Sequence, residues 1–161
     1  MNVGKGSSAG NDQHIGPAQQ FDRSRPSLEP AILPRQLRDA YPSFANPLRE
    51  GALAVQPPIL MITGSGGAGK SVLLGYLFDL VMHAGGQDPL AGRSVVLVSG
   101  GDVQVSAQPT TAELDLAFGE AATGQAERRI GQLLGELRAQ GPPPVLLIDT
   151  LDQLLTPVAE G

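Results

Sequence analysis

The run from Ile59 to Ser71 constrains the fold more than any other part of the chain. Its first five residues form the short apolar run "ILMIT", and "GSGGAGKS" follows directly at residues 64–71. A short apolar run with turn residues on both sides is typical of a strand that is buried on two faces. The residues from Lys70 onward predict a helix, so this segment has the order strand, glycine-rich loop, helix.

The spacing of Gly64, Gly69, Lys70 and Ser71 fits G-x-x-x-x-G-K-[ST], the phosphate-binding loop. Backbone N–H groups of such a loop surround a phosphate, and side chains there would obstruct its approach. Lys70 is predicted to neutralise the β- and γ-phosphates, and Ser71 to give its hydroxyl to Mg²⁺. The predicted nucleotide contacts are Gly64, Ser65, Gly66, Gly67, Ala68, Gly69, Lys70 and Ser71. A glycine-rich turn without function is the alternative, and the strand, loop and helix context argues against it.

Further strands and helices alternate after the loop. "KSVLLGYLFDLVMHAGG" predicts a helix that ends near Gly85 and Gly86, and "SVVLVSG" at 94–100 predicts a second strand. Thr110 and Glu113 have the spacing of a capping box, which predicts a short helix after Thr110. An amphipathic helix is predicted around 123–141, and "PVLLID" at 144–149 predicts a third strand. This alternation is typical of an α/β fold with a parallel sheet.

The first fifty residues are expected to contribute little to the core. Residues 1–28 are polar and glycine-rich, which predicts a mobile arm. Between Ala31 and Glu50, Pro34, Pro42 and Pro47 argue against a long helix and predict irregular packing on the outside. The expected division is therefore an arm and packing segment over 1–50 and a nucleotide-binding core over 51–161.

Two acidic residues follow predicted strands. Asp149 ends "VLLID", where an acid that holds Mg²⁺ is expected, about eighty residues after the loop. Asp102, in "VLVSGGDV", would emerge at the same edge of a parallel sheet as the phosphates and could orient the attacking water. Thr150 occupies the position after Asp149, where a glutamate would be another solution. Asp102 as an exposed turn residue is the alternative, and Asp152 is interpreted as a helix-start residue.

Other charged residues have simpler interpretations. Arg128 and Arg129 could serve a neighbouring subunit as arginine fingers, although consecutive arginines on an amphipathic helix more often form a solvated face. His83 is interpreted as a cation near the negative end of a helix. His14 is interpreted as a solvated side chain of the arm.

Composition limits the possible partners. The formal net charge of −5 and pI near 4.9 argue against a surface built wholesale for nucleic-acid backbones. There is no Cys, which removes disulfides, thiolate zinc sites and cysteine nucleophiles. The longest apolar stretches are far shorter than a membrane span, and the N-terminus lacks the apolar stretch of a signal peptide. The expected protein is soluble and cytoplasmic, or within a virion if viral, and has no membrane partner.

Residues 52–156 resemble the RecA-like branch of P-loop NTPases. "VLLIDTLDQLL" matches its pattern of an apolar run, Asp, then Ser or Thr, while Ser65 replaces the lysine of the ParA/MinD group. "ILMITGSGGAGKSVL" and "SGGDV" are most similar to the hexameric packaging motors of cystoviruses. The resemblance implies an ATPase with ATP and Mg²⁺ as cofactors, and Lys70, Asp102 and Asp149 as catalytic residues. It also implies a ring-shaped homo-oligomer that acts on nucleic acid, as a translocase, helicase or packaging motor.

The chain departs from this branch at two points. The acid after the second strand is usually Glu, whereas here it is Asp102. The predicted strand before the glycine-rich loop, at 59–63, is the Walker A strand, and the one that ends at Asp149 is the Walker B strand. In the RecA-like order, a later strand inserts between these two, and the sequence ends before one appears. We therefore expect a three-layer RecA-like core that is C-terminally incomplete, and marginally stable or aggregating when isolated.

Two other functions remain open on the sequence alone. If the Walker A and Walker B strands pair directly, as in nucleotide kinases and GTPases, the chain would be a small P-loop kinase. A slowly hydrolysing ATP-dependent switch or scaffold is the second alternative. ATPase assays with and without single-stranded nucleic acid would separate the three.

Overall fold

The computed structural model describes residues 26–55 and 59–152. Within these residues the elements follow one another as η2 (Pro30–Ile32), α1 (Arg35–Ala52), α2 (Lys70–His83), β1 (Val95–Ser99), η3 (Gly100–Asp102), α3 (Thr111–Thr123), α4 (Ile130–Gln140) and β2 (Val145–Asp149). The fold is mixed α/β, as predicted. In the described part of the chain, no helix is both long and apolar enough to cross a membrane.

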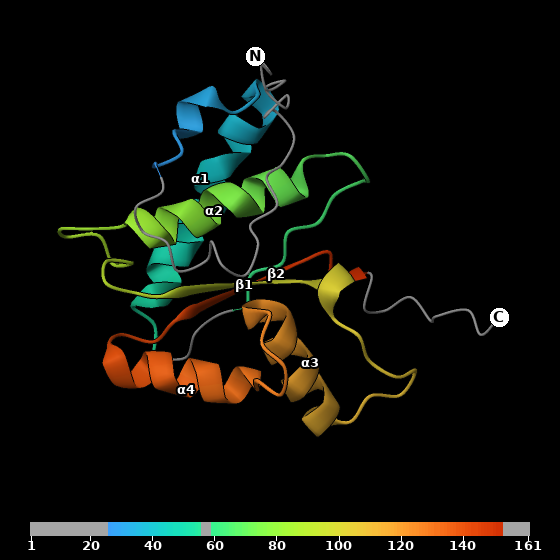
Figure 1. Ribbon diagram of the computed structural model, residues 1–161. Coiled ribbons are helices and arrows are strands. Elements are labelled where there is room, and N and C mark those ends of the chain that lie inside the picture. Colours follow the sequence, from blue (N-terminus) through green and yellow to red (C-terminus); the bar gives the residue numbers. More distant parts are fainter. Residues whose placement is uncertain (1–25, 56–58, 153–161) are drawn as a thin grey trace, which may run out of the picture.

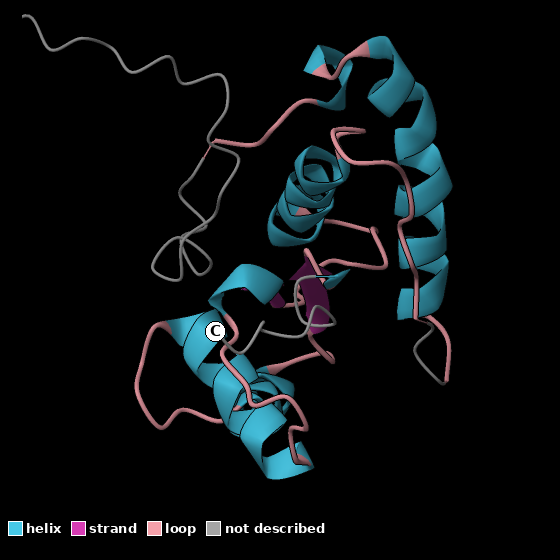
Figure 2. Cartoon of the chain, turned by 90° about the vertical axis from the view of Figure 1, so that its right-hand side faces the viewer, coloured by secondary structure: helices cyan, strands magenta, loops and turns pink. Residues whose placement is uncertain are grey.

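The two strands form a parallel pair at the centre of the molecule. Their register runs from Val95 opposite Val145 to Ser99 opposite Asp149. Helices α1 and α2 lie on one side of this pair, and α3 and α4 lie on the other (Figure 1). Figure 2 shows the strands between the two groups of helices. The predicted strands at 94–100 and 144–149 are therefore confirmed, and so is the parallel orientation predicted for the sheet.

Residues of β1 alternate between two apolar clusters. Val95 and Leu97 pack with α1 and α2, where Leu147 of β2 joins them. Val96 and Val98 pack with the residues of α3 and α4. Because successive side chains of a strand point to opposite faces, four residues of β1 serve two cores. This explains why β1 has no polar face in the sequence.

Helix α2 is confirmed, and it is buried on nearly all sides. Every residue from Leu73 to Asp79 is buried, and so are Val81 and Met82. The helix ends at His83, followed by Ala84 in an extended conformation, so no glycine forms the stop that we predicted. A helix that is apolar nearly all round is expected at the centre of a core.

The strand predicted over residues 59–63 is wrong. These residues have no regular secondary structure, and Ile59 and Met61 are 94% and 71% exposed. Only Ile62 packs against the α1 and α2 cluster. The sheet holds β1 and β2 alone, so residues 59–63 have no hydrogen-bonded strand beside them in the described chain. Apolar composition favours burial, but a strand also requires a partner for its backbone groups.

The irregular packing predicted before residue 50 is also wrong, because α1 is an 18-residue helix that contains Pro42 and Pro47. Each internal proline costs about 3 kcal/mol in an isolated helix. Tertiary packing offsets this cost, since one face of α1 lies against the core around α2. That face consists of Tyr41, Phe44, Ala45, Leu48 and Ala52. The boundary expected near residue 50 thus falls inside a packed helix.

Helix α3 forms where predicted, but α4 begins at Ile130 rather than near residue 123, because Gly124 ends α3 in a left-handed conformation and residues 124–129 connect the two helices. Thr110 Oγ1 accepts a hydrogen bond from Glu113 N at 3.2 Å, which is one half of the predicted capping box. The Glu113 carboxylate instead accepts from the backbone N and hydroxyl of Ser106, and these hydrogen bonds lower its pKa. Helix α3 closely approaches the residues before α4 at Gly119, where an added Cβ would lie 2.0 Å from Arg128 O. Only glycine fits at that contact.

A buried carboxylate anchors the segment before α1 to α2. Asp79 is the only buried charged side chain in the part of the chain that the structure describes. Its Oδ2 accepts from Leu28 N at 2.9 Å and from Ser27 Oγ at 3.3 Å. Its Oδ1 lies 3.1 Å from His83 Nδ1. A buried charge needs such partners, so Asp79 ties residues 26–29 to the central helix.

We predict that Asp79→Ala destabilises the protein by about 1–3 kcal/mol, because it leaves the partly buried Leu28 N–H without its acceptor. Asp39→Ala is the matched control, since Asp39 lies 68% exposed in an i,i+4 pair with Arg35. Such exposed pairs contribute at most about 0.5 kcal/mol. Urea unfolding of both variants measures the difference. Equal stability of the two variants would show that Asp79 is not an anchor.

Candidate functional site

The glycine-rich loop has the backbone conformation that its sequence requires. Ala68 N donates to Ser65 O at 3.2 Å, which closes a turn over residues 65–68. Gly67 in this turn has φ +76°, and Gly69, the N-cap of α2, has φ +87°. Residues with a side chain rarely adopt these backbone angles, so glycine is required at both positions. The loop leads directly into α2, as the motif predicts.

The space beside the turn is open. A Cβ added to Gly66 or Gly67 would meet no atom within 4 Å, and residues 63–68 are exposed. Gly66 is therefore not needed for packing within the described protein. Gly69 differs, because its added Cβ would lie 2.8 Å from Leu37 Cδ1 of α1. Helix α1 thus contacts the base of the loop, and no sequence motif indicated Leu37.

The first turn of α2 presents unpaired backbone donors beside the loop. The first N–H groups of a helix have no partner within it, and Gly69 offers no side chain to accept from them. The first turn also contains no acidic residue. The helix dipole adds partial positive charge at the same place. The arrangement therefore suits an anion such as a phosphate.

Lys70 folds back over the loop. Its Nζ donates to Gly64 O at 2.6 Å and to Ser65 O at 2.9 Å. An ammonium group has three donors, so two of them hold the loop closed on itself. This places the cation beside the turn. Lys70 is therefore located where a phosphate cradled by the loop would need it.

The structure brings together Ser71, in the first turn of α2, and Asp149, the last residue of β2. Ser71 Oγ donates to Asp149 Oδ1 at 3.0 Å, although the two residues are 78 positions apart. A hydroxyl and a carboxylate are the oxygen ligands that Mg²⁺ accepts. Among the described residues, no group of three or more His, Cys, Asp or Glu could hold a metal. Mg²⁺ would therefore need further oxygens from phosphate and water, which is its usual preference.

Asp102 lies at the same edge of the sheet as Asp149. It ends η3, which follows β1 directly, and Ser99 at the end of β1 pairs with Asp149. Figure 1 shows the loop before α2, η3 and the end of β2 on the right-hand side of the molecule. The Asp102 side chain is exposed. The fold thus brings the loop, Asp149 and the turn that carries Asp102 to one edge.

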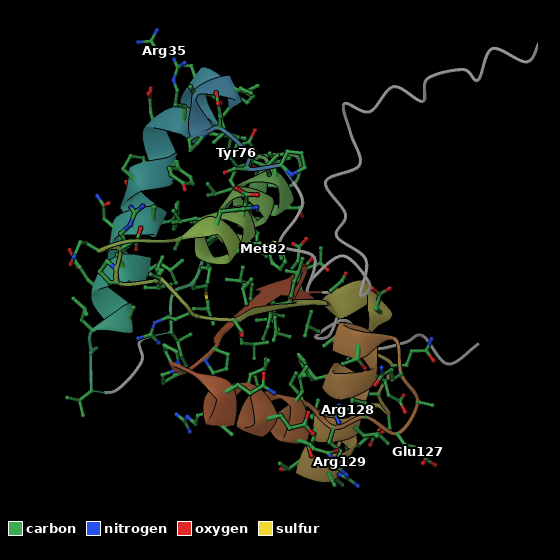
Figure 3. The ribbon with its side chains drawn as sticks, turned by 60° about the vertical axis from the view of Figure 1, so that its left-hand side comes forward. Arg35, Tyr76, Met82, Glu127, Arg128 and Arg129 are labelled. Carbon is green, nitrogen blue, oxygen red and sulfur yellow. The ribbon has the colours of Figure 1, made fainter. Side chains whose placement is uncertain are left out.

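The two consecutive arginines are engaged within the chain. Arg128 forms an ion pair with Glu136, and Arg129 Nη1 lies 3.4 Å from Asp115 Oδ2. Figure 3 shows both arginines beside α3 and α4. These pairs join the start of α4 to its own second turn and to α3. They give Arg128 and Arg129 a structural explanation that does not involve a neighbouring subunit.

Sequence reasoning missed a close contact between the two strand ends. A Cβ added to Gly100 would lie 2.3 Å from Thr150 O, and Thr150 has φ 53°. The double glycine before Asp102 is the only sequence signal of this contact.

Comparison with protein-family models, with curated proteins and with solved structures finds no match to the chain. Any function assigned to it therefore depends on its own residues and their geometry.

We predict that Gly66→Ala leaves stability unchanged but lowers ATP affinity about tenfold, because a methyl group would obstruct one charge-assisted contact to a backbone N–H. Gly85→Ala is the matched control, since Gly85 also has open space around it and lies in the turn after α2. Calorimetric titration with ATP and thermal unfolding measure both effects. Equal affinity in the two variants would contradict a phosphate position at this turn.

Proposed function

We propose that the chain binds Mg²⁺-ATP at residues 64–71 and hydrolyses it. One observation carries the proposal, namely the 3.0 Å hydrogen bond between Ser71 Oγ and Asp149 Oδ1 beside an exposed glycine loop. A glycine-rich turn without function would not require an acid from a distant strand at its helix. Ser71 and Asp149, the two motif residues that would share one Mg²⁺, are neighbours in space.

Each residue of the proposed site has a separate role. The loop amides and the first turn of α2 bind the phosphates, while Lys70 neutralises their charge. Ser71 and Asp149 hold the Mg²⁺, which would stabilise the negative charge of the phosphates during transfer. Asp102 orients the attacking water and accepts its proton. The catalytic residues are thus Lys70, Asp102 and Asp149.

A three-layer RecA-like core is the proposed architecture. Helices cover both sides of the β1 and β2 pair, and β1 carries the turn with Asp102. Residues 59–63 are not paired with β2 in the described chain. Because residues 59–63 form no strand there, the choice of the RecA-like order over that of nucleotide kinases rests on the sequence resemblance.

The coupled process we propose is movement of nucleic acid by a ring of identical subunits. Its support is the sequence resemblance to RecA-like motors alone. A net charge of −5 restricts nucleic-acid contacts to a local channel rather than the whole surface. Stimulation of ATP hydrolysis by single-stranded RNA or DNA tests this step.

A slowly hydrolysing switch or scaffold is the second candidate. The observation in its favour is that the only acid on η3 is an exposed aspartate, one carbon shorter than the expected glutamate. Thr150 also supplies no carboxylate next to Asp149. A turnover rate that nucleic acid does not increase would favour this candidate over the motor.

Lys70→Ala is predicted to weaken ATP binding about tenfold or more, because hydrogen bonds to charged groups contribute about 1.5–3 kcal/mol. Arg35→Ala is the charge-matched control, since the Arg35 side chain on α1 is 87% exposed. Titration with a fluorescent ATP analogue measures both affinities. Unchanged affinity in Lys70→Ala would refute the site.

Two substitutions are predicted to separate hydrolysis from metal binding. Asp102→Asn should bind Mg²⁺-ATP nearly as the parent does but hydrolyse it about a hundredfold more slowly, because an amide cannot accept the proton. Asp149→Asn should make both binding and hydrolysis less dependent on Mg²⁺ concentration. Phosphate release and ATP titration over a range of Mg²⁺ measure these effects. Parent-like hydrolysis by Asp102→Asn would identify Asp102 as a turn residue only.

A further inference from the structure

Thr150 combines two unfavourable features that packing within the described chain does not explain. Its φ of 53° lies in the left-handed region, which β-branched residues rarely adopt. Its Oγ1 is buried and has no hydrogen-bond partner among the described residues. A residue that only fills space needs no hydroxyl, and a buried hydroxyl without a partner is costly. Outliers of this kind concentrate at functional sites.

The position of Thr150 connects it to the proposed Mg²⁺ ligands. It directly follows Asp149, whose Oδ1 accepts the hydrogen bond from Ser71 Oγ. The two residues share one peptide, so a backbone change at Thr150 that moves the Asp149 Cα also moves the Asp149 carboxylate. The strained residue is thus adjacent to the acid whose orientation matters most.

The backbone of Thr150 also lies close to the turn that carries Asp102. A Cβ at Gly100 would lie 2.3 Å from Thr150 O and 3.2 Å from Asp149 O. Gly100 begins η3, Asp102 ends it, and Val103 N closes the turn on Gly100 O at 3.3 Å. The two strand ends therefore touch backbone to backbone. A displacement of the Thr150 carbonyl toward Gly100 would therefore meet the backbone of η3.

We propose that Thr150 is a positioning residue that couples the Mg²⁺ side of the site to the turn with Asp102. When Asp149 turns from Ser71 toward the metal, Thr150 leaves its left-handed conformation and its hydroxyl gains a partner. Its carbonyl then moves relative to Gly100, and η3 brings Asp102 into position. This coupling rests on the proposed Mg²⁺-ATP site, because Asp149 has no reason to turn without it.

The hydroxyl is tested by two substitutions at the same position. Thr150→Val retains the branched shape and removes the hydroxyl, so kcat should fall about tenfold to a hundredfold while KM for Mg²⁺-ATP stays within about twofold. Thr150→Ser retains the hydroxyl and should keep kcat within about threefold of the parent. Thermal unfolding checks that both variants fold. A parent-like kcat in Thr150→Val, or an equal loss in both variants, would overturn the role of the hydroxyl.

The backbone contact is tested without nucleotide. Gly100→Ala must displace the Thr150 carbonyl, so amide hydrogen exchange at residues 149–151 should become faster. Gly135→Ala is the matched control, because an added Cβ there meets nothing within 4 Å. Unchanged exchange at 149–151 in Gly100→Ala would overturn the coupling. Failure of the parent chain to bind ATP would instead refute the proposed function, so the two failures are distinguishable.

Discussion

The parallel pairing of β1 with β2 is the constraint on which the rest of the structure depends. Its register places Ser99 opposite Asp149, so the residues that follow both strands emerge at one edge. The alternating side chains of β1 then supply both apolar clusters, one with α1 and α2 and one with α3 and α4. A slip of one residue would exchange the two faces and bury the wrong side chains. The same five residue pairs therefore fix the core and the edge where the candidate site lies.

Local signals in the sequence predicted much of this fold. The periodicity of α4, the cap at Thr110 and the apolar runs of β1 and β2 all depend on neighbours along the chain, and they formed as expected. Residues 59–63 were mispredicted because their apolar composition says nothing about whether a strand lies beside them. The prolines of α1 argue against a helix, but Tyr41, Phe44 and Leu48 have the spacing of one helical face, and their packing decides the structure. Contacts between distant segments decided both cases.

In the candidate site too, local features could be predicted from the sequence, whereas contacts between distant segments could not. The loop conformation could be predicted because Gly67 and Gly69 are required by backbone angles that few other residues adopt. The contact between Ser71 and Asp149 follows only from two motifs taken together, the phosphate-binding loop and the apolar strand that ends in Asp149. The contacts of Leu37 with Gly69, and of Gly100 with Thr150, join segments with no common pattern. Close approaches of this kind require a glycine, but the glycine alone does not indicate which residue lies against it.

The separation of 78 positions between Ser71 and Asp149 has a consequence for how the site forms during folding. Closing a flexible chain of that length costs on the order of 4 kcal/mol in entropy, before any contact is gained. A single hydrogen bond between exposed groups cannot offset that cost, so the strand pairing and both apolar clusters must already hold the ends together. Partly folded states that retain α2 but lose β2 contain a glycine loop without its acid. The pair formed by Ser71 and Asp149 is thus a property of the native state alone.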